Sequence, residues 1–430
     1  MGGPASARAE GRRSLRGRKV LGINSLGRIG KLTLWHHVGR KHFDAIVVNQ
    51  GREVGKDLEG FCHTIEKDST YGPLHYFLHG RKGEPCVKIE DRGKSLLRID
   101  GMPVAVLRKE RNPANIPWRE HGARVVVDCT GKFNDPNRGE DEDKGSLRGH
   151  FAGGAEKVLN SADFKTKKGE ATKDDAVVLI YGVNHEAYDP ARHHLISAAS
   201  CTTTALAHMM KTLIDAYSVR TILTASMSTI HAVTNTQAVL DNVPKADAKD
   251  LRKTRSILNN IILTSTNAAA ALEKVIPVVR EIGFMADSVR VPTTTASLII
   301  LNVTLRSELD EEGQPIFNRE ALLDLYRRAS EKQQKGLLKL SMDQNVSTDM
   351  IGEDAAVVIE GFETHTRTGF VHIDMESLPG MKPEVLRMLP EKVVRIPVTH
   401  AKIFGWYDNE YGSYTNRLAD LTVHVADRMD

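Results

Sequence analysis

The chain has 430 residues, 40% of them hydrophobic and 27% charged, and its formal net charge is +4. These are the proportions of an ordinary globular protein, and the length predicts more than one domain, because a single hydrophobic core rarely serves so long a chain. No run of 18 apolar residues exists, which argues against a membrane span, and the basic N-terminus lacks the apolar segment of a secretory signal.

Residues 1–18 form a basic stretch rich in glycine, alanine, serine and arginine. Without them the rest of the chain is close to neutral. A short basic arm that lacks aromatic residues is typical of a disordered, solvated end, so the sequence predicts a disordered tail and argues against a nucleic-acid partner.

The four cysteines are Cys62, Cys86, Cys129 and Cys201. They show neither CxxC spacing nor the Cys/His spacing of a metal site, so the sequence predicts no zinc site and no disulfide framework. Reduced thiols in the cytoplasm are the expectation.

A βαβ unit is predicted at the start of the ordered chain. Residues 19–24 form a short apolar strand, residues 31–38 an amphipathic helix and residues 45–48 a second strand. The turn between the first strand and the helix holds Gly27 and Gly30, with Ser25 where a dinucleotide fingerprint has its first glycine. Such a turn places a pyrophosphate at a helix N-terminus, which predicts a dinucleotide cofactor.

The second strand ends at Gln50, where dinucleotide-binding folds commonly carry an acidic residue that binds the adenosine ribose. Arg52 follows two residues later. An amide beside a guanidinium tolerates a ribose 2′-phosphate better than a carboxylate would, so NAD and NADP both stay open.

A further buried strand, residues 124–129, leads into the turn Thr130-Gly131. Ligands of open α/β sheets lie at the carboxyl ends of the strands, so this turn is predicted to line the same cofactor site.

The second half of the chain predicts an α+β domain, because strand-like runs recur between segregated helices. The expected strands are 221–230, 288–291, 297–305 and 393–406, and the expected helices are 205–217, 248–259, 268–275, 319–335 and 416–428. The last helix is amphipathic and is expected to pack back on the first domain.

Cys201 lies in a run of small hydroxyl residues at the start of a predicted helix, and His231 follows at the end of a predicted strand. A helix N-terminus and a nearby imidazole both lower the pKa of a thiol. The pair therefore predicts a cysteine nucleophile at Cys201.

From Lys19 to Asp430 the chain resembles the phosphorylating glyceraldehyde-3-phosphate dehydrogenases. The motifs that carry the resemblance are Asn24 to Gly30, Asp68-Ser69-Thr70-Tyr71-Gly72, Ser200-Cys201-Thr202-Thr203, Thr264-Ser265-Thr266, Arg290-Val291-Pro292-Thr293 and Trp406-Tyr407-Asp408-Asn409-Glu410. The resemblance implies an α/β fold with a Rossmann-type dinucleotide-binding domain and a second, α+β catalytic domain built on a mostly antiparallel sheet. The implied domains are 19–200 with 410–430 for the cofactor and 201–409 for catalysis.

The resemblance also implies a role for each matching residue. Cys201 is the expected nucleophile, which forms a thiohemiacetal and then a thioester, and His231 is the expected base. The expected substrate and phosphate ligands are Ser200, Thr202, Thr234, Arg255, Thr266 and Arg290. The expected cofactor ligands are Gly27, Arg28, Ile29, Gly30, Gln50, Thr130, Gly131 and Asn409.

Several positions depart from the family pattern. Besides Ser25 and Gln50, Thr204 replaces an Asn, Ala232 a Ser, Thr236 an Asp and Asn267 a Gly. The segment after Asn409-Glu410 is one residue longer than usual, and residues 371–392 are an extra segment. None of these changes removes the nucleophile, the base or either arginine.

The resemblance implies a dehydrogenase that converts glyceraldehyde 3-phosphate, inorganic phosphate and NAD(P)+ to 1,3-bisphosphoglycerate and NAD(P)H, as a cytoplasmic homotetramer without a membrane partner. Two alternatives stay open, because a fold does not fix an activity. One is an erythrose-4-phosphate dehydrogenase, and the other is a cofactor-poor relative that acts as a binding or regulatory protein.

Overall fold

The computed structural model describes residues 18–108 and 110–429. Residues 1–17 of the predicted tail therefore lie outside the described residues. Contacts divide the chain into two units: the first runs to Thr204, contains Ile351–Asp354 and resumes at Asn409, and the second contains Ala205–Met350 and Ala355–Asp408. Within the described ranges, no helix is both long and apolar enough to cross a bilayer.

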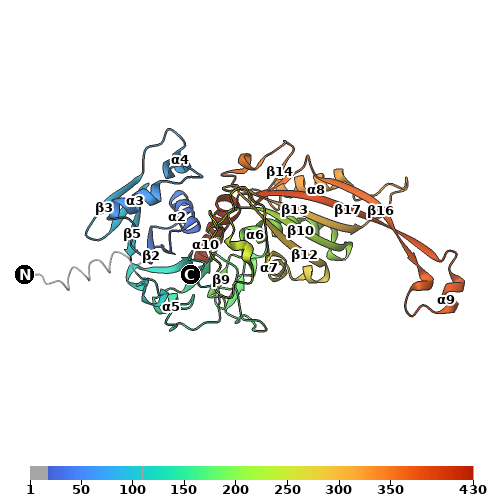
Figure 1. Cartoon of the computed structure of the whole chain (residues 1–430), viewed down its shortest axis with the longest axis horizontal. Helices are drawn as coiled ribbons and strands as arrows, with labels where there is room; N and C mark the ends of the chain where they lie inside the picture. Colours follow the sequence, from blue (N-terminus) through green and yellow to red (C-terminus); the bar gives the residue numbers. More distant parts are fainter. Residues whose placement is uncertain (1–17, 109, 430) are drawn as a thin grey trace, which may run out of the picture. The chain divides into compact units, whose positions relative to one another are not determined.

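The first unit is built on a nine-stranded sheet (Figure 1). In spatial order its strands are β3 (Val87–Asp91), β4 (Leu96–Ile99), β5 (Met102–Arg108), β2 (Ala45–Gln50), β1 (Val20–Asn24), β6 (Ala123–Asp128), β7 (Lys157–Asn160), β9 (Leu195–Ser197) and β8 (Ala176–Val178). From β5 to β8 all neighbours are parallel, while β3 and β4 add antiparallel strands at one edge. The strand order reverses direction at β1, which creates a crevice between β1 and β6.

Helices cover this sheet and close its core. They are α2 (Arg28–Arg40), α3 (Leu58–Glu66), α4 (Leu74–His79), α5 (Gly149–Ala152) and α10 (Arg417–Asp427). Leu21 of β1, Trp35 of α2 and Leu418 of α10 belong to one buried apolar cluster. The last helix therefore completes the core of the first unit, as its amphipathic pattern predicts.

The prediction of an amphipathic first helix is wrong. Every residue of α2 from Gly30 to Val38 is buried, because the helix contacts β1, α4, α10 and residues 411–416 on different sides. A helix enclosed in this way has no solvent face for a polar stripe to mark.

The second unit holds an eight-stranded mixed sheet. The spatial order is β11 (Ile262–Thr264), β12 (Gly283–Val291), β10 (Ile222–Ala232), β13 (Ser297–Arg306), β17 (Val393–Tyr407), β15 (Val357–Glu360) and β14 (Leu338–Ser341), and β16 (His365–Asp374) also pairs with β17. β10 with β12 and β14 with β15 are parallel pairs, and the other pairs are antiparallel. Along β13, residues alternate between buried and half-buried, as a sheet covered mainly on one face requires.

The helices of the second unit are most of α6 (Cys201–Tyr217), α7 (Ala268–Val275), α8 (Arg319–Glu331) and α9 (Pro383–Met388). The prediction of a helix over residues 248–259 is wrong. Only a 3₁₀ turn, Leu251–Thr254, forms there. Leu251 and Leu258 are exposed and Ile257 alone of the three is buried, so the segment has too little buried apolar surface to hold a longer helix against a core.

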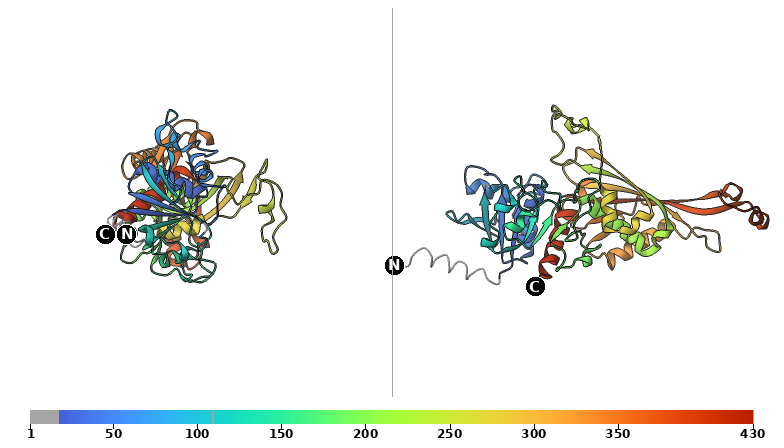
Figure 2. Two further views of the ribbon diagram at one scale, coloured as in Figure 1. Left: turned by 90° about the vertical axis from the view of Figure 1, so that its left-hand side faces the viewer. Right: turned by 90° about the horizontal axis from the view of Figure 1, so that it is seen from below.

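The extra segment at residues 371–392 lies at the end of a long two-stranded ribbon. β16 and β17 pair from His365 with Lys402 to Asp374 with Val393, and α9 lies between them in sequence. Figures 1 and 2 show the two strands running together beyond the other strands of their sheet, with α9 at the tip.

Candidate functional site

The turn after β1 has the backbone geometry of a dinucleotide turn, with a serine where a glycine is usual. Ser25 has a positive φ of 83° and donates its N–H to Asn49 O at 2.7 Å. A Cβ on Gly30 would lie 1.9 Å from Ser25 O, so only glycine fits there. A Cβ on Gly27 would meet no atom closer than Ser25 Oγ, at 3.9 Å. The space above Gly27 therefore lets a ligand approach the N-terminus of α2.

Arg28 is predicted as a cofactor ligand, but its side chain binds two carboxylates of the protein. Its guanidinium donates to Glu410, with Nε to Oε2 at 3.1 Å, and also pairs with Asp68. Burial lowers the pKa of Arg28, but the two carboxylates outweigh it and raise the pKa above the ordinary value. Only the backbone N–H of Arg28 is left to serve a pyrophosphate. Ile29 is half-buried and packs against the apolar cluster of the first unit.

A cavity of about 240 Å³ opens at the carboxyl ends of β1, β2 and β6. The residues that line it are Asn24, Ser25, Gln50, Gly51, Arg52, Glu110, Arg111, Thr130, Lys132 and Phe133. Gln50 Oε1 accepts the N–H of Leu26 at 2.9 Å, so its amide nitrogen is the part left for a ligand. The predicted residues Gln50 and Thr130 are thus brought to one cavity, next to the glycine turn.

A buried network that sequence reasoning missed supports the turn after β6. Asp128 Oδ1 accepts both the N–H and the hydroxyl of Thr130, at 2.9 and 2.6 Å. Its Oδ2 accepts from His150 Nε2 at 3.0 Å and from Asn24 at 2.8 Å. Burial raises the pKa of Asp128, but these hydrogen bonds outweigh it and leave the pKa below its usual value. Gly131, with a φ of 63°, then turns the chain away from the sheet.

A sequence signal existed for only one partner of this network. Asp128 ends a run of buried valines, and a carboxylate at the carboxyl end of a buried strand marks the ligand edge of a sheet. His150 stands after the charged stretch of residues 134–144, with no pattern that ties it to Asp128.

Cys201 is the first residue of α6 and is half-buried. Ser200 provides the N-cap, since its Oγ accepts the N–H of Thr203 at 3.2 Å. The residue before it, Ala199, has a φ of 55°, which is a strained value for alanine. The chain therefore turns sharply into the helix and places the thiol at the positive end of the helix dipole. Thr202, the next predicted ligand, is buried in the first turn of α6.

The segment after Asn409 explains the extra residue seen in the sequence. Tyr411–Asn416 form a π-helix, in which Thr415 N–H reaches Glu410 O at 3.0 Å, five residues back. A π-helical turn absorbs one inserted residue within a helix. It directs the hydroxyl of the buried Tyr414 to Ala199 O at 3.1 Å. Asn409, predicted to bind the nicotinamide, is buried just before this turn.

In the second unit, His231 and Arg290 lie side by side. They are register partners on the parallel strands β10 and β12. Arg290 Nη1 lies 2.5 Å from His231 Nδ1, and Nδ1 lies 2.7 Å from Ala232 O. Burial lowers the pKa of His231 to about 3, the positive charge of Arg290 acts in the same direction, and the carbonyl of Ala232 opposes only in part. Burial and the charge of Arg290 therefore both favour the neutral form of His231.

The other predicted phosphate ligands of this unit stand in loops. The hydroxyl of Thr234 hydrogen-bonds Thr236 and Gln237, both at 3.0 Å. Thr266 accepts the N–H of Ala268 at the start of α7, at 3.2 Å. Arg255 is exposed and pairs with Asp241 at 3.0 Å, so it would have to leave this partner to reach a ligand.

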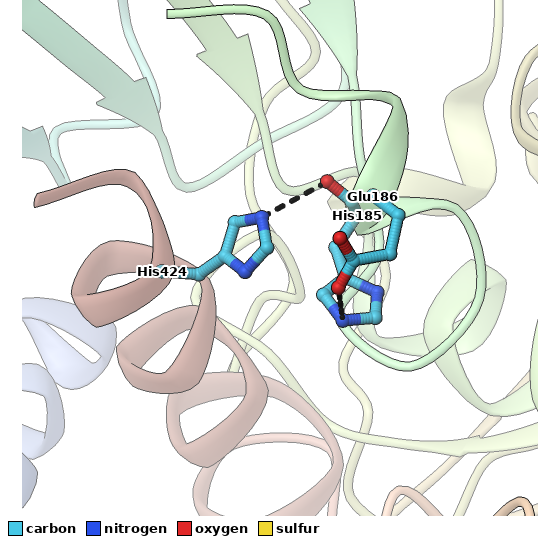
Figure 3. A group of neighbouring side chains, drawn as sticks. All are labelled: His185, Glu186 and His424. Carbon is cyan, nitrogen blue, oxygen red and sulfur yellow. Dashed lines mark hydrogen bonds and ion pairs between the residues drawn. The ribbon is translucent and has the colours of Figure 1, made fainter. Parts of the chain in front are cut away.

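A second group of titratable side chains lies away from the cofactor turn in the first unit. Figure 3 shows His185, Glu186 and His424, whose types suit a metal. His185 Nδ1 accepts the N–H of Gly182 at 3.0 Å, and His424 Nε2 bonds the carbonyl of His185 at 3.1 Å. Arg428 lies 2.9 Å from His424 Nδ1 and 3.2 Å from Glu186. The hydrogen bonds of the two rings and the ion pair of Glu186 with Arg428 account for this arrangement better than a metal site does.

Comparison with known proteins gives matches over both halves of the chain. The model of the glyceraldehyde 3-phosphate dehydrogenase NAD binding domain matches residues 19–136, and that of the C-terminal domain matches residues 200–374. The glyceraldehyde-3-phosphate dehydrogenase of Streptomyces coelicolor is 33% identical over 416 residues, which cover 95% of this chain and 99% of the relative. Glyceraldehyde-3-phosphate dehydrogenase 2 of Bacillus subtilis is 32% identical, over 95% of this chain and 96% of the relative. The cytosolic glyceraldehyde-3-phosphate dehydrogenase of Chlamydomonas reinhardtii is 29% identical, over 95% of this chain and 97% of the relative.

Proposed function

We propose that this chain, which belongs to the glyceraldehyde-3-phosphate dehydrogenase family, oxidises glyceraldehyde 3-phosphate and phosphorylates the product to 1,3-bisphosphoglycerate. The family, the fold class and the class of enzyme, an NAD-dependent phosphorylating dehydrogenase, were expected from the sequence and are confirmed by the matches. The observation that carries the proposed reaction is that Cys201 stands at the capped start of α6, inside the family's own motif.

The proposed role of Cys201 follows from its place at the helix start. A thiolate there attacks the aldehyde carbon, and the resulting thiohemiacetal becomes a thioester once hydride has left. Inorganic phosphate then attacks the thioester carbonyl and expels the thiolate, which restores the thiol group for the next turnover. The helix dipole favours the thiolate both as nucleophile and as leaving group.

His231 is proposed as the base that accepts the hydroxyl proton of the thiohemiacetal. A neutral imidazole is required for this task, and burial and the charge of Arg290 both favour that form. For the substrate phosphate, Arg290 offers a half-buried guanidinium beside this base. Ser200, Thr202, Thr234, Arg255 and Thr266 stay proposed ligands on the strength of the family pattern.

The cofactor turn and cavity fit a nicotinamide dinucleotide. The free space above Gly27 suits the pyrophosphate, the cavity beside Gln50 suits the adenosine, and Gly131 and Asn409 are proposed to serve the nicotinamide end. The bound dinucleotide supplies the hydride acceptor. The protein supplies the N–H groups at the start of α2, from Gly27, Arg28, Ile29 and Gly30.

We infer that the cavity accepts NADP+ as well as NAD+. Three cations, Arg52, Arg111 and Lys132, line it against one carboxylate, Glu110. Since the oxygen of Gln50 is already bonded to Leu26 N–H, the side chain presents N–H donors instead of acceptors. Donors and guanidinium groups suit a 2′-phosphate, whereas a free 2′-hydroxyl is best bound by a carboxylate.

A homotetramer is proposed from family membership. Apolar side chains are exposed in the loop before β11 and along that strand: Val239, Leu240, Val243, Leu251, Leu258, Ile261 and Leu263. A surface with this many exposed aliphatic groups supports self-association. Light scattering after gel filtration should give the mass of four chains, and a monomer at micromolar concentration would contradict the proposal.

The activity is tested by the absorbance of reduced nicotinamide. The protein is mixed with glyceraldehyde 3-phosphate, arsenate and either NAD+ or NADP+, and erythrose 4-phosphate is run in parallel. Faster turnover of glyceraldehyde 3-phosphate supports the proposal, and a higher kcat/KM for erythrose 4-phosphate favours that alternative. If neither cofactor is reduced and calorimetry detects no binding of either, the chain is a binding or regulatory relative.

The cofactor inference is tested separately through two variants. Arg52→Ala and Gln50→Asp should each lower the ratio of kcat/KM for NADP+ to that for NAD+ by about tenfold, since a lost ionic contact is worth roughly 1.4 kcal/mol or more. Lys94→Ala is the control, because Lys94 is exposed and lies outside the cavity. An unchanged ratio in both variants would rule the inference out.

A further inference from the structure

β17 extends past the sheet to which it belongs. Residues 398–407 of β17 pair with β13, whereas residues 393–397 pair, within the described ranges, with β16 alone. Figures 1 and 2 show this two-stranded part of the ribbon beyond the other strands of the second unit. Two isolated strands are at best marginally stable in water, and packing of one face adds the missing stability. The ribbon therefore needs a cover on one of its faces.

The two faces of the ribbon differ in polarity. The odd-numbered residues of β17 are buried from Thr399 to Tyr407, so its even-numbered residues lie on the uncovered face of the sheet. Register partners in neighbouring strands share a face. On the uncovered face the side chains of the ribbon are all aliphatic: Val371, Ile373, Val394, Ile396 and Val398. Val371 and Val394 are 46% and 38% exposed, so this aliphatic face is open to water.

The opposite face of the ribbon is better suited to water. It carries His372, Asp374 and Arg395 among its apolar residues. The guanidinium of Arg395 lies 4.6 Å from the ring centre of Phe370 and covers this ring. The aliphatic face has no charged side chain along residues 370–374 and 393–398, all of which are described. The aliphatic face is therefore the one that a partner would shield.

At the root of the ribbon the same uncovered face becomes basic. This basic root lies on β13, β16 and β17 and consists of Arg306, His365, Arg367, His400 and Lys402. The three strands are described over their whole length, and none of their carboxylates lies on this face. Like charges on neighbouring strands repel one another. The basic root therefore favours an acidic surface as its neighbour.

The loop after β13 has the opposite charge. No lysine or arginine lies between Ser307 and Phe317, and this acidic loop exposes Glu308, Asp310, Glu311 and Glu312. The N–H of Ser307 donates to Pro397 O at 3.0 Å, which holds the start of the loop beside the root of the ribbon. A two-fold axis would set the acidic loop of one copy against the basic root of another, so this region is complementary to itself.

We propose that the aliphatic face of the ribbon docks on a second copy of this chain across a two-fold axis. The basic root of each copy faces the acidic loop of the other, which fixes the orientation of the two chains. The aliphatic side chains supply the surface removed from water, which stabilises both the pair and the ribbon. This interface uses the segment around residues 371–392, which departs from the family pattern, and it does not depend on the proposed reaction.

The first test places a carboxylate on either face of the ribbon. Val394→Glu and Val393→Glu change neighbouring residues of similar exposure, 38% and 43%, that lie on opposite faces. Sedimentation equilibrium from nanomolar to micromolar concentration measures self-association, and circular dichroism checks that each variant is folded. Val394→Glu should raise the dissociation constant by at least about tenfold, because a carboxylate buried without a partner is costly, and Val393→Glu should not.

Equal dissociation constants for these two variants, or a wild type that is monomeric at every concentration, would overturn the proposal. The proposed tetramer has a test of its own, so the two can fail separately. If Val394→Glu keeps the mass of four chains at every concentration at which the wild type does, the tetramer stands and docking of the ribbon is refuted.

The second test reverses charges. Arg367→Glu should weaken self-association by about tenfold or more, since it sets a carboxylate against the acidic loop. Addition of Glu311→Arg and Glu312→Arg to that variant should restore the wild-type dissociation constant. Arg280→Glu is the matched control, because Arg280 is an exposed arginine of the same unit, paired at 3.6 Å with Glu273, and it should leave the constant unchanged. Failure of the added arginines to rescue Arg367→Glu would overturn the choice of a second copy as the partner.

Discussion

At the scale of single residues, the backbone of Ser25 determines which residue can occupy position 30. Ser25 occupies a φ of 83°, which costs a residue with a Cβ roughly 1–2 kcal/mol, and its carbonyl occupies the place where a side chain on residue 30 would begin. The departure from the glycine fingerprint therefore keeps the turn but stores strain in it. Strain of this kind is commonest at ligand sites.

Substitutions in this turn should separate stability from cofactor binding. Ser25→Gly should raise the free energy of unfolding by up to about 1 kcal/mol, because relief of strain exceeds the added chain entropy. Gly30→Ala should lower it by more than about 3 kcal/mol, because a contact of 1.9 Å cannot be relieved locally. Urea unfolding gives both values.

Gly27→Ala is the matched control for that pair. Its added methyl group meets no atom within 3.9 Å, so the free energy of unfolding should change by less than about 0.5 kcal/mol. The affinity for the dinucleotide, measured by calorimetry, should fall, since the methyl group would fill the proposed place of the pyrophosphate. Unchanged affinity would argue against this position for the cofactor.

Cys201→Ser tests the covalent role at the same scale. A hydroxyl is far less acidic than a thiol, so kcat should fall by at least about a thousandfold while the Kd for the dinucleotide stays within twofold. Stopped-flow absorbance and calorimetry supply the two numbers. Residual turnover within tenfold of the wild type would contradict a nucleophilic Cys201.

At the scale of elements, the π-helix Tyr411–Asn416 shows how the fold absorbs one added residue. The extra residue is stored as a wider turn, and α10 begins directly after it. The register of Tyr414 depends on this turn, because an α-helix would rotate the side chain by about 100°.

Deletion of Ser413 should convert the turn to an α-helix and break the bond from Tyr414 to Ala199 O. The free energy of unfolding should fall by about 1–3 kcal/mol, since a buried carbonyl loses its donor. Tyr414→Phe removes the hydroxyl alone and should cost about 1 kcal/mol. If the deletion costs no more than Tyr414→Phe, the register of Tyr414 does not depend on the wider turn.

The sequence predicts elements well where local signals and packing agree. The helix over 268–275 and the strand–turn–helix around Gly30 form as expected. The helix expected over 248–259 does not form, because its leucines find no core. The contact between Asp128 and His150 joins residues that are distant in sequence, so only the folded sheet reveals it.

The same limit applies to the candidate site. Cys201 lies at a helix start and His231 near a strand end, as the motifs predict, but the close approach of Arg290 to His231 could not be predicted. It arises from the register that sets His231 opposite Arg290 across two strands far apart in the sequence. The ion pairs that occupy Arg28 likewise join three separate segments of the first unit.

At the scale of the whole molecule, buried neutral histidines should set the response to acid. Burial, reinforced by Arg40, holds the pKa values of His36 and His37 well below the ordinary value. Unfolded histidines titrate near 6.5, so below that pH the unfolded state binds more protons than the folded state. As the pH is lowered below about 6.5, the free energy of unfolding should therefore decrease by about 1.4 kcal/mol per pH unit for each such histidine.

His37→Leu should reduce the slope of the free energy of unfolding against pH by the contribution of one histidine. Both ring nitrogens of His37 are buried without a hydrogen-bond partner among the described residues, so the variant should also be more stable at pH 7. His63→Leu, at an exposed position, is the control and should keep the wild-type slope. Urea unfolding at pH 5, 6 and 7 measures the slope for the wild type and for both variants. Equal slopes for the wild type and His37→Leu would contradict the role of His37 in the response to acid.

The place of α10 in the core of the first unit has a consequence for synthesis of the protein. Leu418 and Val425 complete the apolar cluster that contains Leu21 of β1. The ribosome delivers β1 first and α10 only after the entire second unit has emerged. The apolar face that α10 covers therefore stays exposed while the second unit is synthesised. Chaperones that bind nascent chains can bind this face during that time.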